Sequence, residues 1–240
     1  MALRDESDVG RWSTPDRPTW VLVVIAVCIA AVAFVIVLSE RAQAPSDSSN
    51  HGSGVSVTDV RELAPFTSVE LAGANTVVIH VGGSQSVTVT GDDNLVDRVT
   101  TVVEGGRLLV DNTGSFTTDA PMRVTVSAPS LDAVELSGAG TVTVDGIAGD
   151  SFTAALTGDG TLVTSGASDR ATIVLAGAGT LDAHDLVATD ATAQLQGTGT
   201  VRVHATSTLD ATLSGTGTIL YQGDPTVTLH NTGTGTVVQE

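Results

Sequence analysis

The stretch Leu136-Ser-Gly-Ala-Gly-Thr141 decides the fold, because the same motif returns throughout the second half of the chain. Each copy has a leucine, two glycines separated by one residue, and a threonine. The further copies occupy residues 156–161, 175–180, 195–200, 213–218 and 231–236, the last with Asn231 in place of leucine. The second glycines are 20, 19, 20, 18 and 18 residues apart. Self-similarity at a fixed period near twenty residues predicts a solenoid.

Apolar residues within each repeat share one parity, so in an extended chain they point to one side. They stand four residues before the first glycine, two before it and four after it. We therefore expect these positions to form the core, and alternate positions to face water. The paired glycines fall on the inward parity, where they allow the wall to bend or to approach its neighbour closely. These structural glycines are Gly138, Gly140, Gly158, Gly160, Gly177, Gly179, Gly197, Gly199, Gly215, Gly217, Gly233 and Gly235.

The threonine of each motif should form an exposed column along the stack. Its members are Thr141, Thr161, Thr180, Thr200, Thr218 and Thr236. A regular array of hydroxyls and methyls is similar to the faces of ice-binding β-helices. We favour the simpler interpretation that β-branched threonine suits an exposed strand and pairs well with itself across strands.

Coils of 18–20 residues with parallel strands predict an all-β, right-handed parallel β-helix of six or seven rungs. Residues 55–130 interrupt the repeat with period-2 apolar runs, which favours a strand-rich N-terminal cap. Within this region Glu104-Gly-Gly-Arg107 is a hairpin-turn signal, and residues 92–96 suggest a short helix or turn capped by an aspartate.

A transmembrane helix is predicted for the nineteen apolar residues from Trp20 to Leu38, which would span roughly 28 Å as a helix. Three arginines precede this run and only Arg41 closely follows it, so the N-terminus should be cytoplasmic. The alternative is a signal peptide cleaved after Ala44, but the apolar run is long for one. The predicted organisation is a disordered cytoplasmic tail over 1–19, the span over 20–38, a flexible linker over 39–54 and a β-helical ectodomain over 55–240.

Charge and composition exclude several classes of partner. The net charge is -17 and all ten basic residues are arginine, which argues against binding to nucleic acid or to anionic lipid headgroups. We interpret the acidity as a means of solubility. A single cysteine excludes an intramolecular disulfide.

In the order of its segments, the chain resembles the putative auto-transporter adhesin, head GIN domain family. The segments that carry the resemblance, found within residues 55–238, begin at Phe66, Val87, Gly106, Arg123 and Leu131. The resemblance implies a right-handed β-helical ectodomain on a bacterial surface or membrane protein. It implies no enzymatic activity and brings no catalytic residues with it.

Candidate chemistry is sparse. Column counting places His184 beside His204, where two imidazoles could share a zinc ion, although an exposed polar ladder is the simpler interpretation. Asp182 and Arg202 should form a surface ion pair on adjacent rungs. The acids do not repeat in one column, as a polysaccharide-cleaving site would need. We therefore predict no catalytic, cofactor-binding or metal-binding residues, and no cofactor.

The sequence thus predicts a non-catalytic, extracytoplasmic module on a single membrane span, which serves surface recognition, adhesion or envelope scaffolding. Its partner would be a protein or glycan of the envelope or the extracellular space. Two alternatives remain at this stage: a carbohydrate-active β-helix enzyme, and an envelope signalling partner acting through the cytoplasmic tail.

Overall fold

The computed structural model describes residues 50–240, which are built almost entirely of β-strands. The first half contains β1 (Ser56–Arg61), β2 (Ser68–Leu71), β3 (Thr76–Val81), β4 (Ser86–Asp92), the 3-10 helix η2 (Val96–Arg98), β5 (Val99–Glu104), β6 (Arg107–Asn112) and β7 (Arg123–Ala128). The second half contains β8 (Ala133–Leu136), β9 (Thr141–Leu156), β10 (Thr161–Leu175), β11 (Thr180–Leu195), β12 (Thr200–Leu213), β13 (Thr218–Gln222), β14 (Thr226–Asn231) and β15 (Thr236–Gln239).

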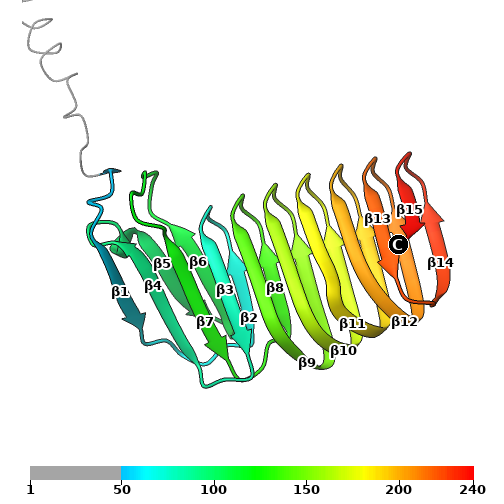
Figure 1. The fold of residues 1–240 in the computed structure, drawn as a ribbon, viewed down its shortest axis with the longest axis horizontal. Coiled ribbons are helices and arrows are strands. Elements are labelled where there is room, and N and C mark those ends of the chain that lie inside the picture. The colour runs from blue at the N-terminus through cyan, green and yellow to red at the C-terminus, as the bar shows by residue number, and fades with distance from the viewer. Residues whose placement is uncertain (1–49) are drawn as a thin grey trace, which may run out of the picture. The chain divides into compact units, whose positions relative to one another are not determined.

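The repeats form a β-solenoid, as the period predicts (Figure 1). Strands β9 to β12 are long and bend midway, so each strand contributes one arm to each of the two walls of the stack. Neighbouring strands are parallel, and equivalent positions of successive motifs pair directly: Thr161 pairs with Thr141 and with Thr180. Because a parallel stack is hydrogen-bonded in the direction of its axis, each coil is fixed by the coil before it. The right-handed sense of the coil stays a prediction.

The core lies between the two walls and contains the residues of inward parity. The motif leucines Leu136, Leu156, Leu175, Leu195 and Leu213 are all fully buried. Burying one leucine side chain contributes about 1.5–3 kcal/mol, so each of these motif copies adds to the stability of the core. Phe152 in β9, the single phenylalanine of the long strands, is also buried. The parity prediction is confirmed for the coils before the last one, in which Leu229 is 50% exposed.

The first coil is made by residues distant in sequence from the next one. Strands β2 and β3 pair in parallel with β8 and β9, so Val69 lies beside Val134, and Thr76 beside Thr141. Residues 69–77 match the later motif with Asn75 in place of the second glycine, and they form the rung next to the regular repeats. The intervening chain leaves the stack and returns, and in doing so adds β6 and β7 on the far side of β2 and β3.

Antiparallel strands close the N-terminal end of the solenoid. Strand β4 pairs with β7, β1 pairs with β4, and β5 pairs with β6, all antiparallel. The β5–β6 turn is the one predicted from Glu104-Gly-Gly-Arg107. Its two glycines have φ values of 56° and 79°, a combination that suits a two-residue hairpin turn.

Asp92 does not cap a helix, so this part of the prediction is wrong. The 3-10 helix η2 begins after Leu95, and no side chain caps its N-terminus. Instead the Asp92 carboxylate is fully buried and accepts hydrogen bonds from the backbone N–H groups of Gly54, Asp119 and Ala120, the first at 2.7 Å. Desolvation alone would raise the pKa of Asp92, but these backbone donors outweigh it and lower the pKa. Asp92 thus joins three separate segments of the cap.

The predicted tail, membrane span and most of the linker (residues 1–49) lie outside the described residues. Within residues 50–240, no helix is long and apolar enough to cross a bilayer.

Candidate recognition surface

The turns that contain the paired glycines stack into a continuous ridge along one edge of the solenoid. We call it the turn ridge: residues 137–141, 157–161, 176–180, 196–200, 214–218 and 232–236. Figure 1 shows these turns aligned along the upper edge of the molecule. Each turn is hydrogen-bonded to the one before it, for example from Thr180 N to Gly160 O at 3.0 Å and from Thr218 N to Gly199 O at 3.1 Å. The ridge is therefore a rigid part of the wall.

The glycines of the turn ridge are required by the closeness of this stacking. A Cβ added at Gly199 would collide with the carbonyl oxygen of Gly179 and lie only 2.6 Å from Leu175 Cδ2. A Cβ at Gly197 would collide in the same way with Gly177 O. All twelve motif glycines would meet the backbone of the preceding turn at such distances. The glycine pairs are thus required by the close stacking of the wall.

The motif threonines stand at the base of the turn ridge and form the expected ladder. From Thr76 and Thr141 to Thr218 and Thr236, each pairs with the threonine of the next rung. All are exposed or half-buried. The hydroxyl oxygens of Thr218 and Thr236 lie 3.4 Å apart. In the last three turns the ridge also has an exposed threonine between its glycines, namely Thr198, Thr216 and Thr234.

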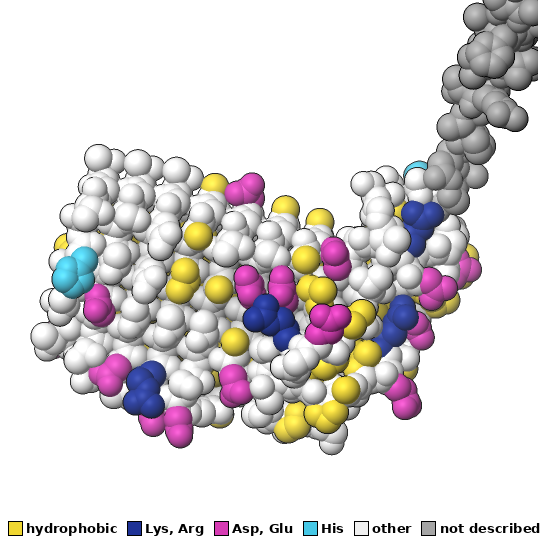
Figure 2. All heavy atoms as spheres, turned by 180° about the vertical axis from the view of Figure 1, so that it is seen from behind, with side chains coloured by type: hydrophobic (Ala, Val, Ile, Leu, Met, Phe, Trp, Pro, Cys, Tyr) yellow, Lys and Arg dark blue, Asp and Glu magenta, His cyan; other side chains and the backbone are white. Residues whose placement is uncertain are grey.

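Uncharged residues dominate the turn ridge. Of its six turns, only one contains a charged residue, Asp159. Figure 2 shows one face of the molecule, on which charged side chains gather over the N-terminal half and along the lower edge, while the upper edge is mostly uncharged. In a chain with a net charge of -17, this edge is a distinct surface of small hydroxyl, methyl and backbone groups.

Charged side chains on the walls pair with one another. Arg107 lies 2.8 Å from Glu70 and 3.4 Å from Glu135, and its hydrogen bond to Glu70 raises the pKa of the guanidinium. The predicted pair of Asp182 and Arg202 is present at 3.4 Å. These pairs lie at the surface, where an ion pair contributes little to stability.

The prediction that His184 and His204 are neighbours is wrong. The coil beginning at Thr180 has two residues more than the next one, and the extra length is taken up by irregular register after Ala183. Val187 therefore pairs with His204. The His184 Nδ1 atom lies instead 3.7 Å from a carboxylate oxygen of Glu240.

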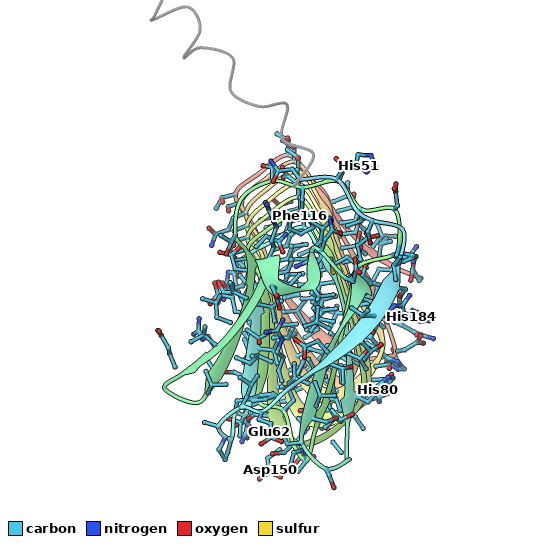
Figure 3. The ribbon with its side chains drawn as sticks, turned by 90° about the vertical axis from the view of Figure 1, so that its left-hand side faces the viewer. His51, Glu62, His80, Phe116, Asp150 and His184 are labelled. Atoms are coloured by element: carbon cyan, nitrogen blue, oxygen red, sulfur yellow. The ribbon has the colours of Figure 1, made fainter. Side chains whose placement is uncertain are left out.

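Within residues 50–240, no group of three or more histidine, cysteine, aspartate or glutamate side chains could hold a metal ion. A surface hollow of about 520 Å³ lies between the end of β1 and the start of β4. Its Gln85 amide is engaged with the backbone of Leu63 and Ala64, at 3.1 Å each. Figure 3 shows that His80, Asp150 and His184 point outward at separate places.

A family model described as "putative auto-transporter adhesin, head GIN domain" matches residues 65–225 of the chain. The chain belongs to this family. The match spans β2 to β13, and so contains five of the six turns of the turn ridge. It stops short of β14 and β15, whereas the sequence resemblance extended over residues 55–238. A comparison with curated proteins found no match.

Solved structures share the fold of this head GIN domain. An adhesin-titled protein from Bacteroides fragilis aligns with a TM-score of 0.67 and 22% identity, over 79% of this chain and 99% of its own. One from Parabacteroides distasonis, also titled as an adhesin, aligns with a TM-score of 0.53 and 20% identity, over 79% and 99%. Another protein of that organism, titled as lipid-binding, aligns with a TM-score of 0.50 and 21% identity, over 79% and 98%.

These similarities establish the architecture of the head GIN domain. In each of these structures the matched region is nearly the whole chain, so the fold occurs there without further domains. Two of the three structures are titled as adhesins and one as lipid-binding.

Proposed function

We propose that this chain is a membrane-anchored, extracytoplasmic recognition module of the adhesin type, and that it acts without catalysis. The observation that carries the proposal is the turn ridge. It is a rigid row of small, uncharged side chains on a protein that is otherwise strongly acidic. A surface of this kind can contact an extended partner, because equivalent groups repeat at the strand spacing of about 4.8 Å.

The side chains of the turn ridge suit binding better than catalysis. Side chains as short as threonine and serine lose little conformational entropy when a partner covers them. Hydroxyl groups can donate and accept hydrogen bonds, so the ridge suits glycans or polar protein surfaces. General acid–base chemistry would need a titratable pair there, and Asp159 is the ridge's only charged residue.

The membrane anchor is supported by the sequence alone. The apolar run from Trp20 to Leu38 has the length of a span, and the arginines before it favour a cytoplasmic N-terminus. The fold unit would then be displayed outside the membrane on a linker rich in serine and glycine. Treating intact cells with a protease tests this topology: residues 50–240 should be cleaved or released, while an epitope placed before residue 20 stays protected. Protection of both parts would contradict the proposal.

The binding proposal is tested with purified residues 49–240. The fragment is immobilised and exposed to cell-envelope extracts and to a glycan array, and bound material is measured before and after long incubation. We expect saturable binding of a protein or glycan that is recovered intact. Turnover of any bound polysaccharide would favour the carbohydrate-active alternative and overturn the non-catalytic assignment.

A further inference from the structure

A hollow lies where the turn ridge meets the N-terminal cap. We call it the cap hollow: it has a volume of about 360 Å³ and is lined by residues 74–76, at the turn between β2 and β3, and by Phe116, Thr118, Pro121 and Met122 of the β6–β7 connection. The turn between β2 and β3 stacks on the first turn of the turn ridge, with Thr141 N donating to Asn75 O at 3.0 Å. Figure 2 shows the upper edge hollowed near the N-terminal end of the described unit. The cap hollow thus continues the line of the turn ridge.

The cap hollow exists because close stacking stops at the turn between β2 and β3. The next connection towards the N-terminal end runs from residue 113 to 122, whereas the turn that it faces runs only from 72 to 75. A Cβ added at Gly73 would have its nearest backbone neighbour, Asn112 N, 3.6 Å away, while every motif glycine of the turn ridge would collide with backbone. Asn75 fills part of this space and donates to the Asn112 side chain. The longer connection does not follow the turn closely, and a space is left between them.

The β6–β7 connection, which forms the outer wall of the cap hollow, is held in place. The buried Asp92 carboxylate accepts hydrogen bonds from two of its backbone N–H groups. Thr117 pairs with the segment before β1 and donates its N–H to Asn50 O at 2.8 Å. Phe116 and Met122 are partly buried against the core. A site that is held in this way before a ligand arrives loses little free energy to ordering when it binds.

Phe116 gives the cap hollow an aromatic surface. Among residues 50–240 there are four phenylalanine or tyrosine side chains and no tryptophan; Phe66 and Phe152 are buried in the core, and Tyr221 lies on β13. Phe116 is half-buried, and Figure 3, which looks onto the N-terminal end, shows it in the upper part of that end. The face of an aromatic ring is negatively polarised. It therefore attracts the C–H groups on the face of a pyranose ring, which have a small positive charge.

The other groups that line the cap hollow favour a neutral sugar. Thr76 and Thr118 are half-buried, and their hydroxyl groups can donate and accept hydrogen bonds, as sugar hydroxyls require. None of the lining residues is charged, so no cation there would compensate the carboxylate of an acidic sugar, which a net charge of -17 repels. The volume lies at the lower end of the range of about 300–1,000 Å³ for small-molecule sites. It suits one or two sugar rings.

We propose that the cap hollow binds a neutral pyranose residue of a glycan, with the sugar ring against Phe116 and the sugar hydroxyls at Thr76 and Thr118. Thr76 also begins the threonine ladder, since it pairs with Thr141. The following sugars of the glycan would therefore run along the turn ridge. This inference rests on the recognition function proposed above and names the class of ligand that the function requires.

Saturation-transfer NMR on the full chain in lipid nanodiscs tests the proposal. The probes are the methyl glycosides of neutral hexoses and N-acetylhexosamines, and empty nanodiscs serve as the blank. At least one glycoside should bind with a dissociation constant of about 1–10 mM. Saturation should be strongest on the C–H protons of one face of its ring, because that face lies against Phe116.

Three variants locate the binding site. Phe116→Leu removes the aromatic ring but keeps an apolar side chain, and should weaken binding about fivefold or more. Thr118→Val removes a hydroxyl from a side chain of similar shape and should weaken binding about two- to tenfold. Tyr221→Leu is the matched control: it removes an aromatic ring from β13, at the other end of the solenoid, and should bind like the wild type. Thermal melts verify that each variant folds, and Thr118→Val decides if Phe116→Leu does not.

The proposal is overturned if no glycoside binds, if folded Phe116→Leu and Thr118→Val bind like the wild type, or if Tyr221→Leu loses as much affinity as they do. Its failure is distinct from that of the recognition function. A chain that binds no glycoside but retains a protein from envelope extract would refute the sugar site and leave recognition standing. A chain that binds glycosides at Phe116 but retains nothing from the envelope would support the site and refute the wider function.

Discussion

Two glycine substitutions test whether the turn ridge depends on backbone contact between successive coils. In Gly199→Ala, the added methyl group collides with Gly179 O and comes to 2.6 Å from Leu175 Cδ2, so the turn must move away from its neighbour. Overpacking of this kind costs about 1–3 kcal/mol. The movement also strains the hydrogen bond from Thr200 N to Gly179 O, now 3.2 Å, and losing it costs about 1 kcal/mol. We expect a loss of about 3 kcal/mol in the free energy of unfolding.

The control is Gly149→Ala at the opposite bend. A Cβ there meets no heavy atom within 4 Å, and its φ is not positive. This substitution should be neutral, or stabilising by about 0.5 kcal/mol through the unfolded state. In a unit of this size 1 kcal/mol shifts the melting temperature by about 2–4 °C, so Gly199→Ala should melt roughly 6–12 °C below the wild type, and the control should melt at or slightly above the wild type. Equal melting temperatures in circular dichroism would refute the claim that close stacking requires the glycines.

Three further predictions concern the core, the cap and the walls. Leu195→Ala truncates a fully buried core residue and should cost about 2–5 kcal/mol in denaturant unfolding; a cost below 1 kcal/mol would contradict the core assignment. Because folding lowers the pKa of Asp92 below its usual 3.8, its carboxylate should stabilise the fold fully above that pH, and the stabilisation should fade as pH falls through the lower folded value. Asp92→Asn should therefore melt lower than wild type at pH 7, with the gap narrowing below pH 3.8; a gap independent of pH would refute this account. Arg202→Ala removes a solvent-exposed ion pair with Asp182 and should cost less than about 1 kcal/mol, so a larger loss in the same unfolding assay would show that the pair matters to the fold.

The regular coils could be predicted closely from the sequence, because one physical rule repeats there. A fixed period brings equivalent residues together, and alternation separates core from surface. The columns of Leu195 and Thr200 follow from those two facts alone. The first coil follows as well once the isolated motif at residues 69–77 is aligned with the later copies.

The cap could be predicted only in part, since its contacts join segments with no repeating pattern. The hairpin at Gly105 and Gly106 has a local signal. Asp92, by contrast, accepts hydrogen bonds from backbone groups 27 and 38 residues away, and no local sequence pattern around Asp92 predicts those partners. The buried Asn75 is similar: it stands where later motifs have glycine, and its side chain donates to the Asn112 side chain at 2.7 Å.

The histidine column failed for a different reason. Counting residues from the turn ridge assumes that neighbouring coils stay in register. This assumption holds near the ridge and fails at the lower bend, where coils of different length take up their extra residues. The coil containing His184 is two residues longer than the next one, so register is lost there. Candidate sites near the turns are therefore predictable from sequence, while those at the opposite bend are not.

The most direct test of the proposed function compares two charge-bearing variants of residues 49–240 in binding to the ligand recovered from envelope material. In the first, Thr198→Arg and Thr216→Arg place long cations on the turn ridge; in the second, Thr189→Arg and Ser207→Arg place them among exposed residues of the lower bend. The account predicts that the first variant loses at least tenfold in affinity while the second binds like the wild type. Equal binding by both variants, each shown to be folded, would contradict the assignment of recognition to the turn ridge.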